Sequence, residues 1–114
     1  MKSPDVVKAL AALAQESRLA IFRLLVQRGP RGLSAGNIAD ELGILPATLS
    51  FHLKELSAAG LLQARTESRF IFYSARFDRM TELVTFLTAN CCGGNPCTPI
   101  ALSKPAKRPG KAVV

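Results

Sequence analysis

The feature that most constrains the fold is a pair of short amphipathic helices predicted between residues 34 and 60. Ser34 is placed to cap the first helix. Gly43 follows that helix, and a glycine takes the left-handed dihedrals of a sharp turn at little cost. Pro46 then stands where a second helix begins, because its fixed φ suits the first helical position. The apolar positions at helical spacing are Ala35, Ile38, Ala39 and Leu42 in the first helix, and Leu49, Leu53 and Leu56 in the second, which ends at Gly60.

The second of these helices has an outward face that suits insertion into a DNA groove. Two short helices at this separation form a helix-turn-helix, in which the second helix reads the major groove. Its outward positions are small, hydroxyl-bearing, aromatic or basic, with Ser50 and His52 on the flanks. The DNA-contacting residues predicted on this helix are Thr48, Ser50, Phe51, His52 and Lys54.

A β-hairpin is predicted directly after the helix-turn-helix. Residues 61–66 and 70–74 are short runs rich in large apolar side chains, and residues 67–69 separate them. Arg65 and Arg69 lie near the predicted tip, where cations reach phosphates or a minor groove. The alternative is a surface hairpin whose arginines are merely solvated. A hairpin in this position is a recurrent DNA-binding arrangement, which favours a winged helix-turn-helix with Arg65 and Arg69 at the DNA.

Three further helices predict a mainly α fold with one small β-hairpin. Ser3 and Pro4 have the pattern of a cap and first turn, a second helix spans about residues 16–28, and Asp78 is placed to cap the last helix. The side chains expected to face inward are Val6, Val7, Leu10 and Leu13 in the first of these helices, Leu19, Phe22, Leu25 and Val26 in the second, and Met80, Leu83, Val84 and Leu87 in the last.

The apolar stripe of the last helix follows a domain whose core is already filled. It either covers that core or forms a contact between two copies of the chain. We favour a homodimer in which the last helix pairs with the first helix of each chain. Two-fold symmetry then places two recognition helices on a palindromic double-stranded operator.

Length and charge fit one small DNA-binding domain followed by a tail. The chain has 114 residues and a net charge of +7. Residues 1–90 hold 11 Lys and Arg against 8 Asp and Glu, whereas residues 91–114 hold 4 basic residues and no acidic ones. We predict a DNA-binding and dimerisation domain over residues 1–90 and a basic, disordered, cysteine-containing tail over residues 91–114. The absence of a long apolar run or a signal core predicts a cytoplasmic protein without a membrane partner.

Three runs resemble the ArsR/SmtB family of winged-helix metalloregulatory repressors: ALAQESRLAIFRLL, NIADELGILPATLSFHLKELSAAGLL and RTESRFIFYS. The resemblance covers about residues 5–90, and its most specific piece is TLSFHLKELSAAGLL. It implies a homodimer that represses its own operon and leaves the DNA when an inducer binds. It also places Thr48, Ser50, Phe51 and His52 on the recognition helix, and Arg69 at the wing tip.

The recognition helix departs from the family pattern at three positions. Pro46 and Ala47 stand where relatives often have polar DNA contacts, and Phe51 often has a polar counterpart. An apolar Phe51 suits packing on a thymine methyl group. These departures concern the operator sequence rather than DNA binding itself.

Both sensing sites that are common in the family lack their ligands here. The thiol site on the first helix of the helix-turn-helix needs cysteines near Glu41 and Leu42, but the run there is ELGIL. The zinc site on the last helix needs Asp and His pairs, but that helix has Asp78 and Glu82 and no histidine. His52 is the only histidine in the chain. A sensor site is therefore expected elsewhere.

Cys91, Cys92 and Cys97 are the only cysteines, and they fall together in CCGGNPC. Thiolate is a soft ligand, and three thiolates suit the three-coordinate geometry of As(III) or Sb(III). Glycines at 93 and 94 and the proline at 96 allow Cys97 to turn back toward the pair. Zinc fits less well, because it takes four ligands. Relatives with a C-terminal cysteine trio of this kind are arsenic-responsive, and that resemblance supports the same inducer.

The predicted function is therefore a repressor that needs no cofactor to bind DNA and releases its operator on binding As(III) or Sb(III). Four alternatives remain: redox sensing through a Cys97 disulfide, sensing of cadmium, lead or bismuth, an architectural DNA-binding dimer without a ligand, and cysteines that are incidental. An enzyme with a cysteine nucleophile needs a base or cation beside the thiol, and His52 lies on a different functional element. No phosphate loop, carboxylate pair or cofactor motif is present, so the chain is predicted not to be an enzyme.

Overall fold

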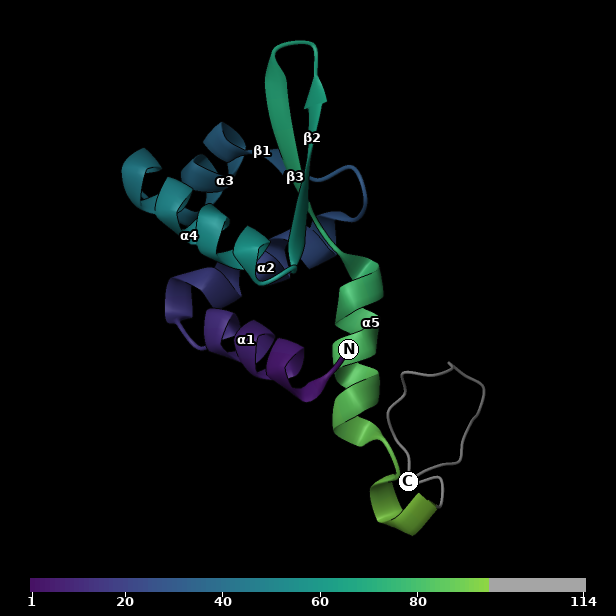
Figure 1. The fold of residues 1–114 in the computed structure, drawn as a ribbon. Helices are drawn as coiled ribbons and strands as arrows, with labels where there is room; N and C mark the ends of the chain where they lie inside the picture. The colour runs from purple at the N-terminus through teal and green to yellow at the C-terminus, as the bar shows by residue number, and fades with distance from the viewer. Residues whose placement is uncertain (95–114) are drawn as a thin grey trace, which may run out of the picture.

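The computed structural model describes residues 1–94 as five helices, a small sheet and a final 3-10 turn. In Figure 1, the hairpin of β2 and β3 projects beyond a cluster of α2, α3 and α4, α1 crosses the opposite side of that cluster, and α5 leads away from the hairpin. The elements are α1 (Ser3–Leu13), α2 (Glu16–Arg28), β1 (Leu33–Ser34), α3 (Ala35–Leu42), α4 (Pro46–Ala58), β2 (Leu62–Glu67), β3 (Phe70–Ala75), α5 (Phe77–Thr88) and η1 (Cys91–Gly94).

The hydrophobic core lies among α1, α2, the helix-turn-helix and the base of the hairpin, and α5 adds Leu83 to it. Ile38 of α3 and Leu49, Leu53 and Leu56 of α4 are buried, as their spacing predicted. Burial of each such side chain contributes about 1.5–3 kcal/mol, so this interior face holds α4 against the rest of the chain. Within residues 1–94, the largest fully buried side chains are Ile21, Leu25, Ile38, Leu49, Leu56 and Leu61.

The sheet has three antiparallel strands in the order β1-β3-β2, one strand more than predicted. β2 and β3 form the expected hairpin, in which Arg65 pairs with Phe72, and residues 68 and 69 make the turn. The additional strand is Leu33–Ser34, whose Leu33 pairs with Tyr73. Two residues are too few to show a strand alternation, so only its pairing with β3 reveals it.

Gly32 sits where β1 meets β3, and we expect its replacement by alanine to be strongly destabilising. Its φ is +71°, and an added Cβ would overlap the Tyr73 carbonyl group and approach the Ser74 Cβ at 3.1 Å. Gly32→Ala should lower the free energy of unfolding by at least about 2 kcal/mol in urea denaturation. Gly36→Ala is the matched control, because an added Cβ on α3 meets nothing within 4 Å and should stabilise by about 0.5 kcal/mol. Equal stabilities of the two variants would contradict this account.

Two predicted helix caps are wrong. Ser3 is the first residue of α1, and the cap is Lys2, whose backbone N–H donates to the Asp5 carboxylate at 3.2 Å. Asp78 lies inside α5, and Arg76 is the residue that precedes the helix. The Arg76 guanidinium donates to the Asp78 carboxylate at 2.9 Å and holds the pKa of Asp78 below its ordinary value.

Several side chains that were expected to face inward are exposed. Val7 and Leu10 of α1 are 64% and 41% exposed, because the small residues Ala9 and Ala12 face the core instead. Leu19 is 44% exposed. These residues have the apolar spacing of their helices, but they lie on the side of the helix that faces solvent rather than the core.

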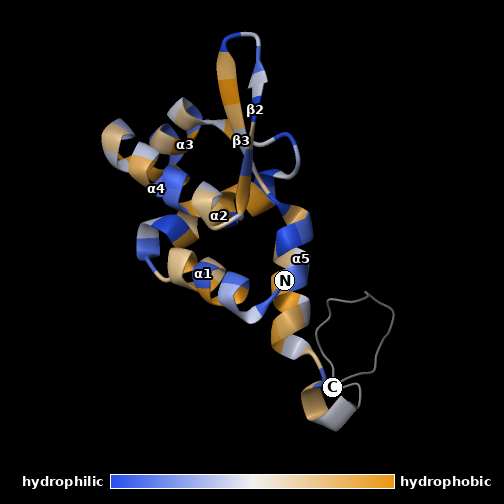
Figure 2. Ribbon diagram, in the orientation of Figure 1, coloured by the Kyte–Doolittle hydropathy of each residue, from blue (hydrophilic) through white to orange (hydrophobic). Residues whose placement is uncertain are grey.

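α5 divides its apolar residues between the core and the surface. Leu83 is buried in the chain's own core, whereas Phe86 and Leu87 are 41% and 57% exposed. Figure 2 shows apolar residues along α1 and along the half of α5 that lies farther from the hairpin. Across residues 1–94, no helix combines the length and the apolarity that crossing a membrane would require.

Candidate nucleic-acid interface

The turn between α3 and α4 is built as its sequence predicts. The Ser34 hydroxyl accepts a hydrogen bond from the Asn37 N–H at 3.2 Å and so caps α3. Gly43 ends α3 with a φ of 65°, in the left-handed region. The Ile44 N–H then donates to the Ala39 carbonyl at 3.1 Å, and Pro46 opens α4. This geometry sets the angle at which α4 leaves α3.

α4 presents one exposed face while its other side packs in the core. Phe51 is 55% exposed even though it is a large aromatic residue. The exposed predicted contacts on this helix, named here the recognition face, are Thr48, Ser50, Phe51 and Lys54. Hydroxyl, aromatic and ammonium groups can contact base edges, thymine methyl groups and phosphates respectively.

His52 is not part of the recognition face, because its side chain is buried, and its role as a DNA contact stays a prediction. It is 7% exposed, since one step along the helix from Phe51 turns its side chain toward the interior. The Nδ1 atom lies 3.3 Å from an Nη1 nitrogen of Arg18 on α2. His52 is therefore a buried polar residue whose Nδ1 atom has a partner on α2.

The two wing arginines are held differently. Arg69 is exposed in the turn of the hairpin, next to Ser68, whose φ is 59°. Arg65 lies farther down β2, where its guanidinium stacks on the Phe72 ring at 5.1 Å from the centroid and donates to the Arg31 carbonyl at 3.1 Å. A further contact with Glu67 at 3.4 Å offsets part of its charge. Arg69 is thus the more available of the two for a phosphate.

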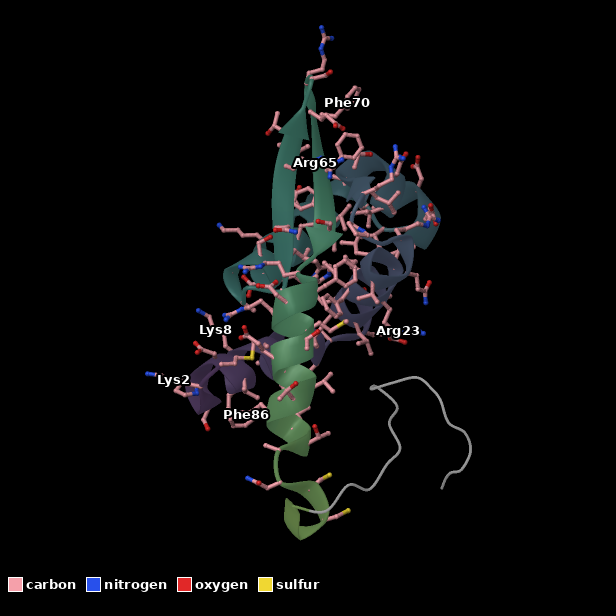
Figure 3. The ribbon with its side chains drawn as sticks, turned by 90° about the vertical axis from the view of Figure 1, so that its right-hand side faces the viewer. Lys2, Lys8, Arg23, Arg65, Phe70 and Phe86 are labelled. Atoms are coloured by element: carbon pink, nitrogen blue, oxygen red, sulfur yellow. The ribbon has the colours of Figure 1, made fainter. Side chains whose placement is uncertain are left out.

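Figure 3 shows the two strands of the hairpin side by side, with Phe70 nearer its end than Arg65. Phe70 and Ile71 are 58% and 48% exposed, so the outer part of β3 is apolar as well as projecting. The hairpin therefore combines a cation at its turn with apolar side chains beside it. That composition suits contact with the sugars and bases of a groove as well as with its phosphates.

Sequence reasoning missed the polar contacts that hold the interface in place. Arg18 contacts His52 across 34 positions of sequence, and the Arg31 carbonyl holds Arg65 across the same separation. Arg28 and Glu41 form an ion pair at 2.6 Å that joins α2 to α3. No local pattern marks such pairs, because each depends on which elements the fold brings together.

Cys91 and Cys92 lie at the end of α5, in the short turn η1. Both are exposed, and Cys92 has a φ of 55°. Cys97 lies outside the described residues. Within residues 1–94, no three His, Cys, Asp or Glu residues gather closely enough to hold a metal ion. The turn η1 thus covers the first four residues of the predicted tail, and the complete cysteine trio stays a prediction.

Comparison with known proteins assigns the architecture. Residues 13–63 match the family model of a helix-turn-helix domain. The HTH-type transcriptional regulator YceK of Bacillus subtilis is 40% identical over 75% of this chain and 88% of its own length. An ArsR-like transcriptional regulator from Rhodococcus superposes with a TM-score of 0.67 at 27% identity, covering 74% of this chain and 76% of the other. The chain belongs to the ArsR-like winged helix-turn-helix transcriptional regulators.

Two further similar proteins have descriptions that concern assembly and metal resistance. The winged helix-turn-helix domain of Mb0332 from Mycobacterium bovis is described as homodimeric and superposes with a TM-score of 0.61 at 27% identity, covering 84% of this chain and 89% of that one. A cadmium resistance regulatory protein from Staphylococcus aureus, a CadC homologue, is 30% identical over 70% of this chain and 64% of its own length. The relatives are transcriptional regulators rather than enzymes, as predicted for this chain.

Proposed function

We propose that this ArsR-like regulator is a homodimeric repressor that binds a palindromic operator and releases it when As(III) or Sb(III) binds Cys91, Cys92 and Cys97. The observation that carries the DNA-binding part is α4, which exposes Thr48, Ser50, Phe51 and Lys54 while its opposite side is buried. The observation that supports the sensing part is the grouping of every cysteine in the chain directly after α5.

The recognition face supports sequence readout, and the hairpin supports backbone contact. Ser50 and Thr48 can donate to or accept from base edges, and Phe51 can pack on a thymine methyl group. Arg69, exposed at the hairpin turn, can contact a backbone phosphate. Specific and non-specific contacts thus come from different elements, so they can be tested separately.

Arg69→Ala should weaken binding to all DNA sequences and reduce the slope of log affinity against log salt by about one phosphate contact. Arg65→Ala is the matched comparison on the same hairpin. Because the Arg65 guanidinium already contacts Phe72, Glu67 and the Arg31 carbonyl, its removal should change the salt slope less. Mobility-shift titrations at several salt concentrations measure both slopes. An unchanged slope for Arg69→Ala would remove that residue from the interface.

The exposed apolar residues of α1 and α5 support the dimer. Val7, Leu10, Phe86 and Leu87 leave apolar surface uncovered on two helices that pack against each other. The homodimeric state described for Mb0332, a relative of the same fold, points to the same assembly. A second copy of the chain covering this surface would place two recognition faces on one side of the dimer.

Leu87→Asp should convert the dimer to a monomer, because it would bury a charge in an apolar contact at a cost of several kcal/mol. Leu87 is 57% exposed in the single chain, so the monomer should keep its fold and circular dichroism. Gln27→Asp, at an exposed position on α2, is the control and should remain dimeric. Sedimentation velocity distinguishes the two states. A dimeric Leu87→Asp variant would place the interface on another surface. Leu83 is unsuitable for this test, since it lies in the chain's own core.

The cysteine-rich segment supports a soft, three-coordinate ligand. Cys91 and Cys92 are exposed at the end of α5, and glycines follow them. Drawing three sulfurs around one ion requires the chain after α5 to rearrange, and α5 is also a proposed dimer helix. A coupling of about 1–3 kcal/mol between the two events would weaken operator binding about 5- to 150-fold.

One titration separates the metalloid proposal from its alternatives. DNA from upstream of the chain's own gene is the probe, and arsenite, antimonite, cadmium, zinc and peroxide are added in parallel. Release by arsenite and antimonite supports the proposal. Release by cadmium, which the name of the Staphylococcus aureus relative suggests for that protein, would favour a broader soft-metal sensor. Release by peroxide alone would favour redox sensing, and release by none would favour an architectural protein.

A further inference from the structure

The recognition helix is tied to the corner between α1 and α2 by a polar contact that sits behind its DNA-facing side. His52 is 7% exposed, and its Nδ1 lies 3.3 Å from an Arg18 Nη1 nitrogen. The same guanidinium donates through Nε to the Ala12 carbonyl at 2.7 Å. The Arg18 backbone N–H in turn donates to the Gln15 side chain at 2.8 Å, which caps α2. One arginine therefore joins the end of α1, the start of α2 and the inner side of α4.

The chemistry of the pair fixes the direction of its hydrogen bond. An arginine guanidinium has only donors and stays protonated. The His52 Nδ1 atom must therefore be the acceptor, and the proton of the neutral imidazole must lie on Nε2. The Ala12 carbonyl, in the last turn of α1, has no partner within the helix ladder and gains one from Arg18.

We infer that Arg18 and His52 are positioning residues for DNA recognition, which set how far α4 and its recognition face stand from the α1–α2 corner. His52 directly follows Phe51, so a shift of its side chain moves the recognition face with it. The α1 end of the contact continues into the helix that carries the exposed Val7 and Leu10. The expected effect on DNA binding rests on the proposed function, whereas the expected effect on the conformation of α4 does not.

Operator affinity is the first quantity to measure. The control is a variant at position 52 that restores a hydrogen-bond acceptor for Arg18. His52→Leu fills the buried site with an apolar side chain that offers no hydrogen-bond acceptor. Arg18→Met keeps an extended, flexible side chain but lacks the guanidinium donors. Each should weaken operator binding about tenfold, the effect of losing a hydrogen bond to a charged group. The double variant should be no weaker than either single variant, because the two residues act as one unit.

His52→Asn should bind nearly as tightly as the parent protein, since the asparagine Oδ1 stands close to the position of Nδ1. Leu56→Val, a core change on the same helix, should lower thermal stability without weakening the operator affinity of the folded protein. A His52→Leu protein that binds like the parent, or a His52→Asn protein that binds as weakly as His52→Leu, would overturn the inference.

Nuclear magnetic resonance without DNA is the second readout. Because the chain has one histidine, selective ¹⁵N labelling reports this imidazole alone, and Nδ1 should be unprotonated in the neutral form. His52→Leu and Arg18→Met should shift the same amide resonances of α4, whereas His52→Asn should shift them little. A proton on Nδ1 would refute the donor assignment. If the parent binds no DNA while these shifts appear, the proposed function fails and the positioning contact stands.

Discussion

Replacing both Ser50 and Phe51 by alanine is expected to abolish sequence-specific DNA binding while the fold survives. Both side chains are exposed on α4, so their removal leaves the buried side of the helix intact. Each lost base contact should cost about 1–3 kcal/mol of discrimination. Together they should bring operator affinity close to that for unrelated duplex DNA, which is about 10³-fold or more weaker in specific binders.

The measurement is a mobility-shift titration with operator and unrelated duplexes, at one salt concentration, beside circular dichroism of the free protein. Ser57→Ala, at another exposed position of α4, should leave operator affinity unchanged. Operator affinity retained by the doubly substituted protein would refute the assignment of α4 as the reading element. Weak binding together with altered circular dichroism would mean that the substitutions damaged the fold instead.

Replacing any one of the cysteines at positions 91, 92 and 97 by serine should leave operator binding intact when arsenite is absent. Each replacement should also abolish most of the decrease in operator affinity that arsenite causes in the parent protein. A hydroxyl is nearly isosteric with a thiol but is a hard ligand, so it cannot replace a sulfur around a soft ion. The parent protein should lose about 5- to 150-fold in operator affinity at saturating arsenite. X-ray absorption of the loaded parent should show arsenic with sulfur neighbours only.

Ala89→Ser is the control for these variants, because it adds a hydroxyl beside η1 without removing a thiol, and it should respond like the parent. Zinc should release little, since a three-thiol set lacks its fourth ligand. If all three serine variants respond to arsenite as the parent does, the sensor is not CCGGNPC. If only Cys97→Ser and one of the adjacent pair matter, and peroxide is as effective as arsenite, a disulfide switch explains the result better.

Local patterns predicted the elements that position the interface. Ser34, Gly43 and Pro46 set the two ends of the turn between α3 and α4, and each does so through its own backbone or side-chain chemistry. The helix predicted over about residues 16–28 is likewise observed as α2, and Gly29, with a φ of 81°, follows its last residue. The hairpin was predictable because its strands are neighbours in sequence, joined by a two-residue turn.

Patterns were less reliable for the direction in which a helix faces. Val7, Leu10 and Leu19 have the spacing of core residues, yet the core accepts Ala9, Ala12 and Ile21 instead. An apolar stripe shows that a helix covers something, but not whether that partner belongs to its own chain or to a second one. The same uncertainty made Leu83 and Leu87 look equivalent, although the first is buried and the second exposed.

The sequence alone therefore determined the helix-turn-helix, the hairpin, the exposed Thr48, Ser50, Phe51 and Lys54, and the grouping of the cysteines. These follow from residues within one or two turns of each other, where spacing and backbone preference act directly. Only the tertiary structure decided that His52 belongs inside and that Leu33 and Ser34 form a third strand. The first outcome depends on Arg18, which lies 34 positions from His52, and the second on Tyr73, which lies 40 positions from Leu33 (73 − 33). Only the packing of the whole chain brings these residues into contact.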